Sequence, residues 1–207
     1  TMEIMNQLKN LKKISKIKLA KNDPAHDFEH IMRVYRNAEK ICKTENGNKK
    51  LILSAVLLHD IVKIKNQKDS AIKSAKLSEK ILKENNFFDD EIKIISDAIK
   101  EHSFSKGKIP SSIEGKILQD ADRLDAIGAI GLARVFSFSG SNNRPFYDPN
   151  DPFSRNRSVN DNKWALDHFF EKLLTLEKKM NTKTGKILAK NRTKILKNFL
   201  KELKSEI

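Results

Sequence analysis

The chain has 207 residues, of which 38% are hydrophobic and 33% charged, and its formal net charge is +14. A chain of this length can bury a substantial core, so we expect a single domain over residues 1–207. The basic charge indicates either a surface for nucleic acid or a lysine-rich surface from a coding bias toward Lys, Asn and Ile. We favour the second, because lysines are spread along the whole chain and aromatic residues make up only 7%. The charge then permits phosphate-bearing ligands, and we expect no stable nucleic-acid complex.

The cysteine content and hydropathy indicate the compartment. A single cysteine, Cys42, excludes an internal disulfide and is typical of a reducing environment. No apolar stretch approaches the roughly 18 residues of a membrane span, and the first residues show no signal-peptide core. We therefore expect a cytoplasmic protein with no membrane partner.

The first two predicted helices cover residues 3–20 and the segment after Asp27. The first has apolar side chains at helical spacing among lysines, which is typical of a helix that packs on its own domain and exposes a basic face. Asp27 is well placed as the N-cap of the second helix. His30 falls at the edge of that helix's apolar stripe and should face the margin of the interior, whereas His26 precedes the helix.

The run Leu51–Leu58 predicts a helix buried on nearly all sides, and it ends in His59-Asp60. An imidazole beside a carboxylate at the end of a buried segment needs a partner. A backbone or hydroxyl group would suffice, and so would a metal ion. This stretch alone leaves both readings open.

Two amphipathic helices are predicted next, over residues 68–85 and from Asp89 to about His102. His102 lies one turn beyond Ala98 and Ile99, so it points toward the core where the helix ends. A histidine in such a place is more often a satisfied core residue than a catalytic one. Its position at a helix end keeps it a candidate for a functional site.

A further helix, predicted from Ile117 to Val135, holds three carboxylates among Ala, Ile, Leu and Gly: Asp120, Asp122 and Asp125. Removing several carboxylates from water is expensive, so some should be paired or bind a cation. Arg123 cannot face every carboxylate on one helix. The glycines of this segment would let another element approach closely.

Residues 137–162 form a long stretch rich in Gly, Asn, Pro and Ser, which predicts a lid, a binding loop or a disordered segment. Its arginines, Arg144 among them, suit a loop that closes on phosphates. Two final helices are predicted over residues 164–179 and 182–206, with Thr182 as the N-cap of the second. Every strong periodicity is near 3.6, which predicts an all-α fold.

The ordered set His30, His59-Asp60 and Asp122 resembles the pattern of the HD superfamily of metal-dependent phosphohydrolases. Three blocks resemble those of a prokaryotic subgroup of small, single-domain members: His26–His30 followed by Arg33-Val34, then Leu57–Ile61, then Asp120–Gly131. The resemblance implies an all-α, HD-type helical bundle in which His30, His59, Asp60 and Asp122 hold one divalent metal ion. Imidazole ligands make Mn, Fe, Co or Ni candidates beside Mg.

The resemblance also implies hydrolysis of nucleotides. We expect (d)NTP pyrophosphohydrolysis by a metal-activated water, in a monomer or homodimer with a small-molecule nucleotide substrate. The alternatives are a nucleotide phosphomonoesterase and a nucleotide-sensing module with weak or no turnover. Lys63 is the main argument for the sensing module, because many HD hydrolases carry acidic residues soon after the His-Asp pair. We assign catalytic or positioning roles to His26, Asp27 and His102, and substrate contacts to Lys63, Arg123, Asp125 and Arg144.

Overall fold

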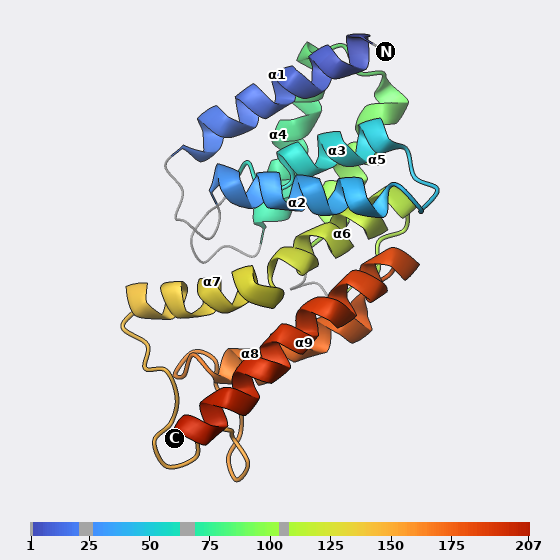
Figure 1. The fold of residues 1–207 in the computed structure, drawn as a ribbon. Coiled ribbons are helices and arrows are strands. Elements are labelled where there is room, and N and C mark those ends of the chain that lie inside the picture. The colour runs from blue at the N-terminus through green and yellow to red at the C-terminus, as the bar shows by residue number, and fades with distance from the viewer. Residues whose placement is uncertain (1, 21–26, 63–68, 104–107) are drawn as a thin grey trace. The chain divides into compact units, whose positions relative to one another are not determined.

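The computed structural model describes residues 2–20, 27–62, 69–103 and 108–207. All regular secondary structure within these ranges is helical, which confirms the predicted all-α class (Figure 1). In the part of the chain described, no helix is both long enough and apolar enough to cross a membrane. The chain divides into two compact units, Thr1–Asp122 and Arg123–Ile207.

The first unit is built around α3, the buried helix predicted from the apolar run. All eight residues from Leu51 to Leu58 are buried. The helix packs against α1, α2, α4 and α5. Within the described ranges, five helices lie wholly in the first unit: α1 (Met2–Leu19), α2 (Phe28–Ile41), α3 (Lys49–Leu58), α4 (Ser70–Glu84) and α5 (Asp89–Glu101). A further helix, α6 (Ile113–Asp125), begins in the first unit and ends in the second.

Two helix starts follow the predicted capping chemistry. The Asp27 side chain accepts a hydrogen bond from the backbone N–H of His30 at 2.9 Å, and the Thr182 hydroxyl accepts one from Gly185 N–H at 2.9 Å. Each side chain satisfies a backbone donor that has no partner within its helix. Both predicted N-caps are therefore confirmed.

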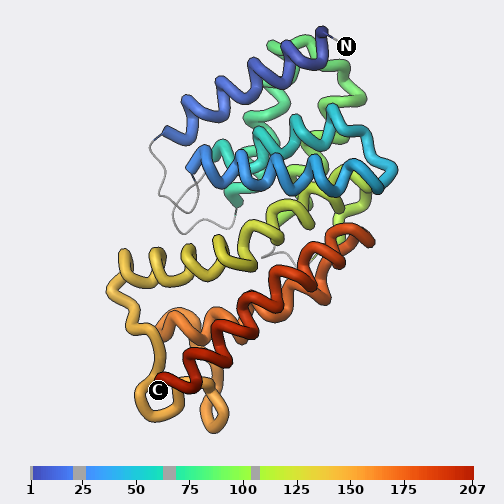
Figure 2. The backbone as a smooth tube through the Cα atoms, viewed as in Figure 1, coloured from blue at the N-terminus to red at the C-terminus, as the bar shows by residue number. Residues whose placement is uncertain are grey.

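The second unit contains α7 (Gly128–Ser141), α8 (Asp167–Glu171), a 3₁₀ helix, η2 (Leu173–Lys179), and α9 (Lys183–Glu206). The backbone trace shows η2 and α9 running side by side (Figure 2). Contacts among aromatic rings join α7, α9 and the residues between them; these rings belong to Phe136, Phe146, Phe169 and Phe199.

The prediction of one helix from Ile117 to Val135 was wrong, because the chain breaks between α6 and α7. Gly128, the first residue of α7, has a φ of +78°, which the interior of one continuous helix does not allow and which glycine adopts without strain. A Cβ on Gly131 would collide with the carbonyl group of Ala126. Gly131 therefore serves the turn, and a Cβ added to Gly128 would lie only 3.1 Å from the side-chain stem of Arg192.

The predicted helix over residues 164–179 was also wrong, since this segment forms the short α8 and then η2. The chain turns out of the helical conformation at Lys172, which has φ −127° and ψ −61°. The loop before it begins later than predicted, because α7 continues to Ser141. Arg157 organises this loop by donating two hydrogen bonds, at 2.6 and 2.8 Å, to the buried carboxylate of Asp167.

Candidate metal centre

His30 comes from the first turn of α2, directly after the Asp27 cap. Its side chain is only 2% exposed, because it shares the buried side of the helix with Val34 and Asn37. Asn37 in turn donates a hydrogen bond from Nδ2 to the carbonyl oxygen of Ala121 on α6, at 3.0 Å. This bond joins α2 to α6 directly beside Asp122, the residue that α6 contributes to the site.

His59 is the C-cap residue of α3 and is fully buried. Its Nδ1 lies 2.7 Å from the carbonyl oxygen of Val56. Because a carbonyl oxygen only accepts, Nδ1 carries the proton and Nε2 keeps a lone pair. Nε2 is buried without a hydrogen-bond partner among the described residues. The ring therefore presents an unsatisfied acceptor atom to the interior.

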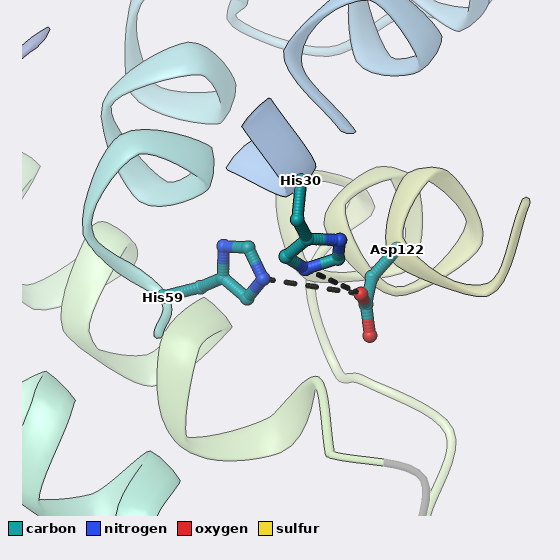
Figure 3. Close-up of side chains that lie close together, drawn as sticks. All are labelled: His30, His59 and Asp122. Atoms are coloured by element: carbon teal, nitrogen blue, oxygen red, sulfur yellow. Dashed lines mark ion pairs between the residues drawn. The ribbon is translucent and has the colours of Figure 1, made fainter. Parts of the chain in front are cut away.

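The nitrogen atoms of the two histidines converge on two carboxylates. His30 Nε2 lies 3.5 Å and His59 Nε2 lies 3.9 Å from Oδ1 of Asp122, which projects from α6 (Figure 3). Both Nε2 atoms also lie 4.0 Å from Oδ2 of Asp60. The Asp122 side chain is 30% exposed, so a small molecule has access to the cluster.

This arrangement fits a divalent metal ion. Two atoms that each bind a common ion at about 2.1 Å are at most about 4.2 Å apart, and all four separations are below that limit. Two imidazole nitrogens with two carboxylate oxygens suit Mn, Fe, Co or Ni. An ion would also satisfy the buried Nε2 of His59. The site is assembled from α2, the end of α3 and α6.

The charge states favour cation binding. Burial lowers the pKa of His59 from 6.5 to about 4, although the carboxylates of Asp60 and Asp122 oppose the shift. The ring is therefore neutral at pH 7 and can donate its lone pair. Burial raises the pKa of Asp122, but the nearby histidines lower it further than burial raises it, so this carboxyl is ionised.

His102 lies beside the cluster and is held in the same way as His59. It is the C-cap residue of α5, it is buried, and its Nδ1 lies 2.6 Å from the carbonyl oxygen of Ile99. Its ring meets the His59 ring edge-on, with 5.0 Å between centroids. Ligand atoms of His59, Asp60 and His102 all lie within 4.8 Å of one another. The structure therefore brings His102 together with the predicted metal ligands.

Gln119 supports this side of the site, a role that the sequence analysis missed. Its Nε2 donates hydrogen bonds to the carbonyl oxygens of His102 at 3.3 Å and Lys108 at 3.0 Å. The side chain is completely buried on α6. A lone amide within an apolar helix was the only sequence signal, and it does not identify the partners.

The remaining predicted site residues fall into two groups. Asp27 lies at the start of α2, where its carboxylate caps the helix, while His26 and Lys63 lie outside the described residues. The others belong to the second unit, where each has a partner.

In that unit Arg123 donates a hydrogen bond to the carbonyl oxygen of Lys179. Asp125 is buried and pairs with Arg134 at 2.8 Å. The guanidinium of Arg144 lies over the Phe138 ring, 5.4 Å from its centroid. Substrate contacts by Arg123, Asp125 and Arg144 stay predictions.

Comparison with known proteins places this chain in a family of hydrolases. The family model described as "HD domain" matches residues 27–127, which contain every residue of the cluster. The chain is 33% identical over 211 residues to the uncharacterized protein YpgQ of Bacillus subtilis, an alignment that covers 97% of this chain and 96% of the relative.

Solved structures agree with this result. The crystal structure of Bacillus subtilis YpgQ in complex with ADP has a TM-score of 0.80 at 31% identity, covering 99% of this chain and 97% of that one. An HD-superfamily hydrolase from Bacillus thuringiensis has a TM-score of 0.79 at 32% identity, covering 98% and 97%. This chain belongs to the HD superfamily of metal-dependent hydrolases, as its motifs predicted.

Proposed function

We propose that this protein is a nucleotide phosphohydrolase that removes pyrophosphate from (d)NTPs. The observation that carries the proposal is the convergence of His30, His59, Asp60 and Asp122 on one point that a small molecule can reach. The ADP bound by the 31% identical YpgQ supports a nucleotide as the ligand here. In this reaction the triphosphate loses pyrophosphate in one step, rather than orthophosphate.

A bound divalent ion would supply charge neutralisation at a phosphate group and would acidify a water molecule. The chain's own contribution is a fixed donor set. The Nδ1–H of His59 is engaged by the Val56 carbonyl oxygen, so Nε2 stays an acceptor throughout. Asp122 is ionised beside the histidines, and the burial of both histidines excludes bulk water from their side of the site.

His102 is the residue we assign to the phosphate chain. Its Nδ1 is held by the Ile99 carbonyl oxygen, so Nε2 is the ring atom that can contact a ligand. In the protonated form Nε2 donates a hydrogen bond to a phosphate oxygen, and in the neutral form it accepts one from water. Asp27 supports the site indirectly, by fixing the start of α2 at His30.

Turnover on a panel of (d)NTPs, NDPs and NMPs, with pyrophosphate and orthophosphate measured separately, tests the proposal. We expect pyrophosphate release from triphosphates with Mn, Co, Ni, Fe or Mg, and its loss in His59→Ala. His168→Ala is the matched control, because His168 pairs with Asp161 in the second unit. Orthophosphate as the first product would favour the phosphomonoesterase. Tight nucleotide binding without turnover with any of these metals would favour the sensing module.

The role of His102 needs a measurement of metal content beside turnover. His102→Ala should bind metal with a stoichiometry like that of the wild type and lose most of its activity. Unchanged turnover would refute the assignment. Lost metal binding would show that His102 belongs to the ligand set instead.

A further inference from the structure

One side of α9 carries a continuous row of lysines. Successive lysines are three or four residues apart, so at 100° per residue all of them fall within an arc of about 80°. Every one is exposed, and the two acidic residues of the helix, Glu202 and Glu206, lie outside the arc. The lysine row comprises Lys183, Lys186, Lys190, Lys194, Lys197, Lys201 and Lys204.

The charge of the lysine row is uncompensated in the described structure. Some lysines of the first unit have acidic partners, such as Lys50 with Glu91 at 2.7 Å and Lys93 with Asp97 at 2.7 Å. Within the described ranges no lysine of the row forms an ion pair. At a rise of 1.5 Å per residue the row is about 32 Å long. It is a line of positive charge with no acidic residue interleaved.

We propose that the lysine row binds the phosphodiester backbone of a nucleic acid without reading its sequence. A length of about 32 Å corresponds to about nine base pairs at 3.4 Å per step, so the row can meet a succession of phosphates. Lysine contacts phosphate as a point charge, and the row contains no arginine or aromatic side chain to contact bases. This proposal differs from our expectation from the sequence, in which lysines spread along the whole chain gave no nucleic-acid surface.

A lipid surface fits α9 less well than a nucleic acid does. A helix that lies on a membrane inserts a free apolar face, but the apolar side of α9 is buried within its own unit at Ala189 and Leu196. The exposed Ile187 and Ile195 are two turns apart and lie outside the row. A narrow line of charge also matches a chain of phosphates better than a plane of headgroups.

Two charge-matched variants of the full chain test the proposal. The row variant replaces Lys190, Lys194, Lys197 and Lys201 with glutamine. The control variant replaces four exposed lysines of α1 with glutamine and loses the same net charge; these are Lys9, Lys12, Lys13 and Lys16. All eight side chains are exposed, so both variants should keep the wild-type far-UV circular dichroism spectrum.

Binding to a duplex of about 30 base pairs and to a single strand of the same length should be measured between about 50 and 200 mM salt. With all lysines of the row engaged on the duplex, the logarithm of affinity should fall with the logarithm of salt concentration with a slope near −6, so wild-type affinity drops several thousandfold; on the single strand the slope should be near −5. The row variant should show a slope near −3 and a drop of about fortyfold, and the control variant should match the wild type. His59→Ala should bind as the wild type does, because this surface does not depend on the metal centre.

Three results would overturn the proposal. Equal losses in the row and control variants would show that only net charge matters. Absence of wild-type binding at about 50 mM salt would exclude the surface altogether. Binding to vesicles containing phosphatidylserine, without binding to either nucleic acid, would assign the row to a membrane.

Discussion

Replacing His59 with alanine should abolish the stabilisation that a divalent ion gives to the folded protein. The predicted ligands are residues 30, 59, 60 and 122, so an ion would link three helices that are distant in sequence. Because this set of ligands exists only in the folded state, metal binding adds directly to folding stability. His59 contributes the one buried ligand atom without another partner in the described structure, so its removal should affect binding most.

The size of the effect follows from linkage. At a free metal concentration about 100 times Kd, binding stabilises the folded state by about 2.7 kcal/mol, which at about 2–4 °C per kcal/mol raises Tm by about 5–10 °C. Thermal unfolding of wild type, His59→Ala and the control His168→Ala should be followed with EDTA or with Mn, Co, Ni, Fe or Mg. Comparing each variant with its own metal-free sample removes the effect of the mutation on basal stability.

A full metal-dependent rise in Tm in His59→Ala would contradict this role of His59. A wild-type Tm that no divalent ion raises would contradict the metal site itself. Loss of the rise in His168→Ala as well would show that the shift does not report on this site.

Three further predictions concern stability. As pH falls from 6.5 to 4, His59 of the metal-free protein gains a proton in the unfolded state before it does in the folded state, so the free energy of unfolding should fall by about 3 kcal/mol. In His59→Gln, the urea midpoint should depend less on pH in this range. Asp167→Ala leaves the guanidinium of Arg157 without its bidentate partner. Urea unfolding should show that the second unit is destabilised by about 3–5 kcal/mol, with metal affinity unchanged. A loss below about 1 kcal/mol would contradict a structural role for this pair. Gly128→Ala places a Cβ at a φ of +78° and against Arg192, and should cost about 1–2 kcal/mol by calorimetry, whereas a neutral effect would mean that the turn relaxes.

The helix predictions were correct where neighbouring residues in the sequence decide the conformation. The caps at Asp27 and Thr182 and the buried run Leu51–Leu58 were all readable, because each depends on neighbouring residues. The break between α6 and α7 was not, since Gly128 follows a strongly periodic apolar segment. The spacing of apolar residues does not reveal a single residue with positive φ.

The lysine row of α9 was also present in the sequence, as a spacing of three and four residues. The spacing does not stand out in the sequence, because lysines are frequent throughout the chain. Only the structure separates lysines that pair with acidic residues, such as Lys93 with Asp97, from a row that has no such partner among the described residues.

The sequence by itself determined the helical class, and its resemblance to the HD superfamily predicted two histidines and two aspartates as the metal ligands. The tertiary structure decided which carboxylates meet the histidines. Asp122 approaches His30 and His59, whereas Asp125, three residues along the chain, pairs with Arg134. It also decided that Nε2 is the free acceptor of His59, through the carbonyl oxygen of Val56. These outcomes depend on the packing of α2, α3 and α6, which no local pattern encodes.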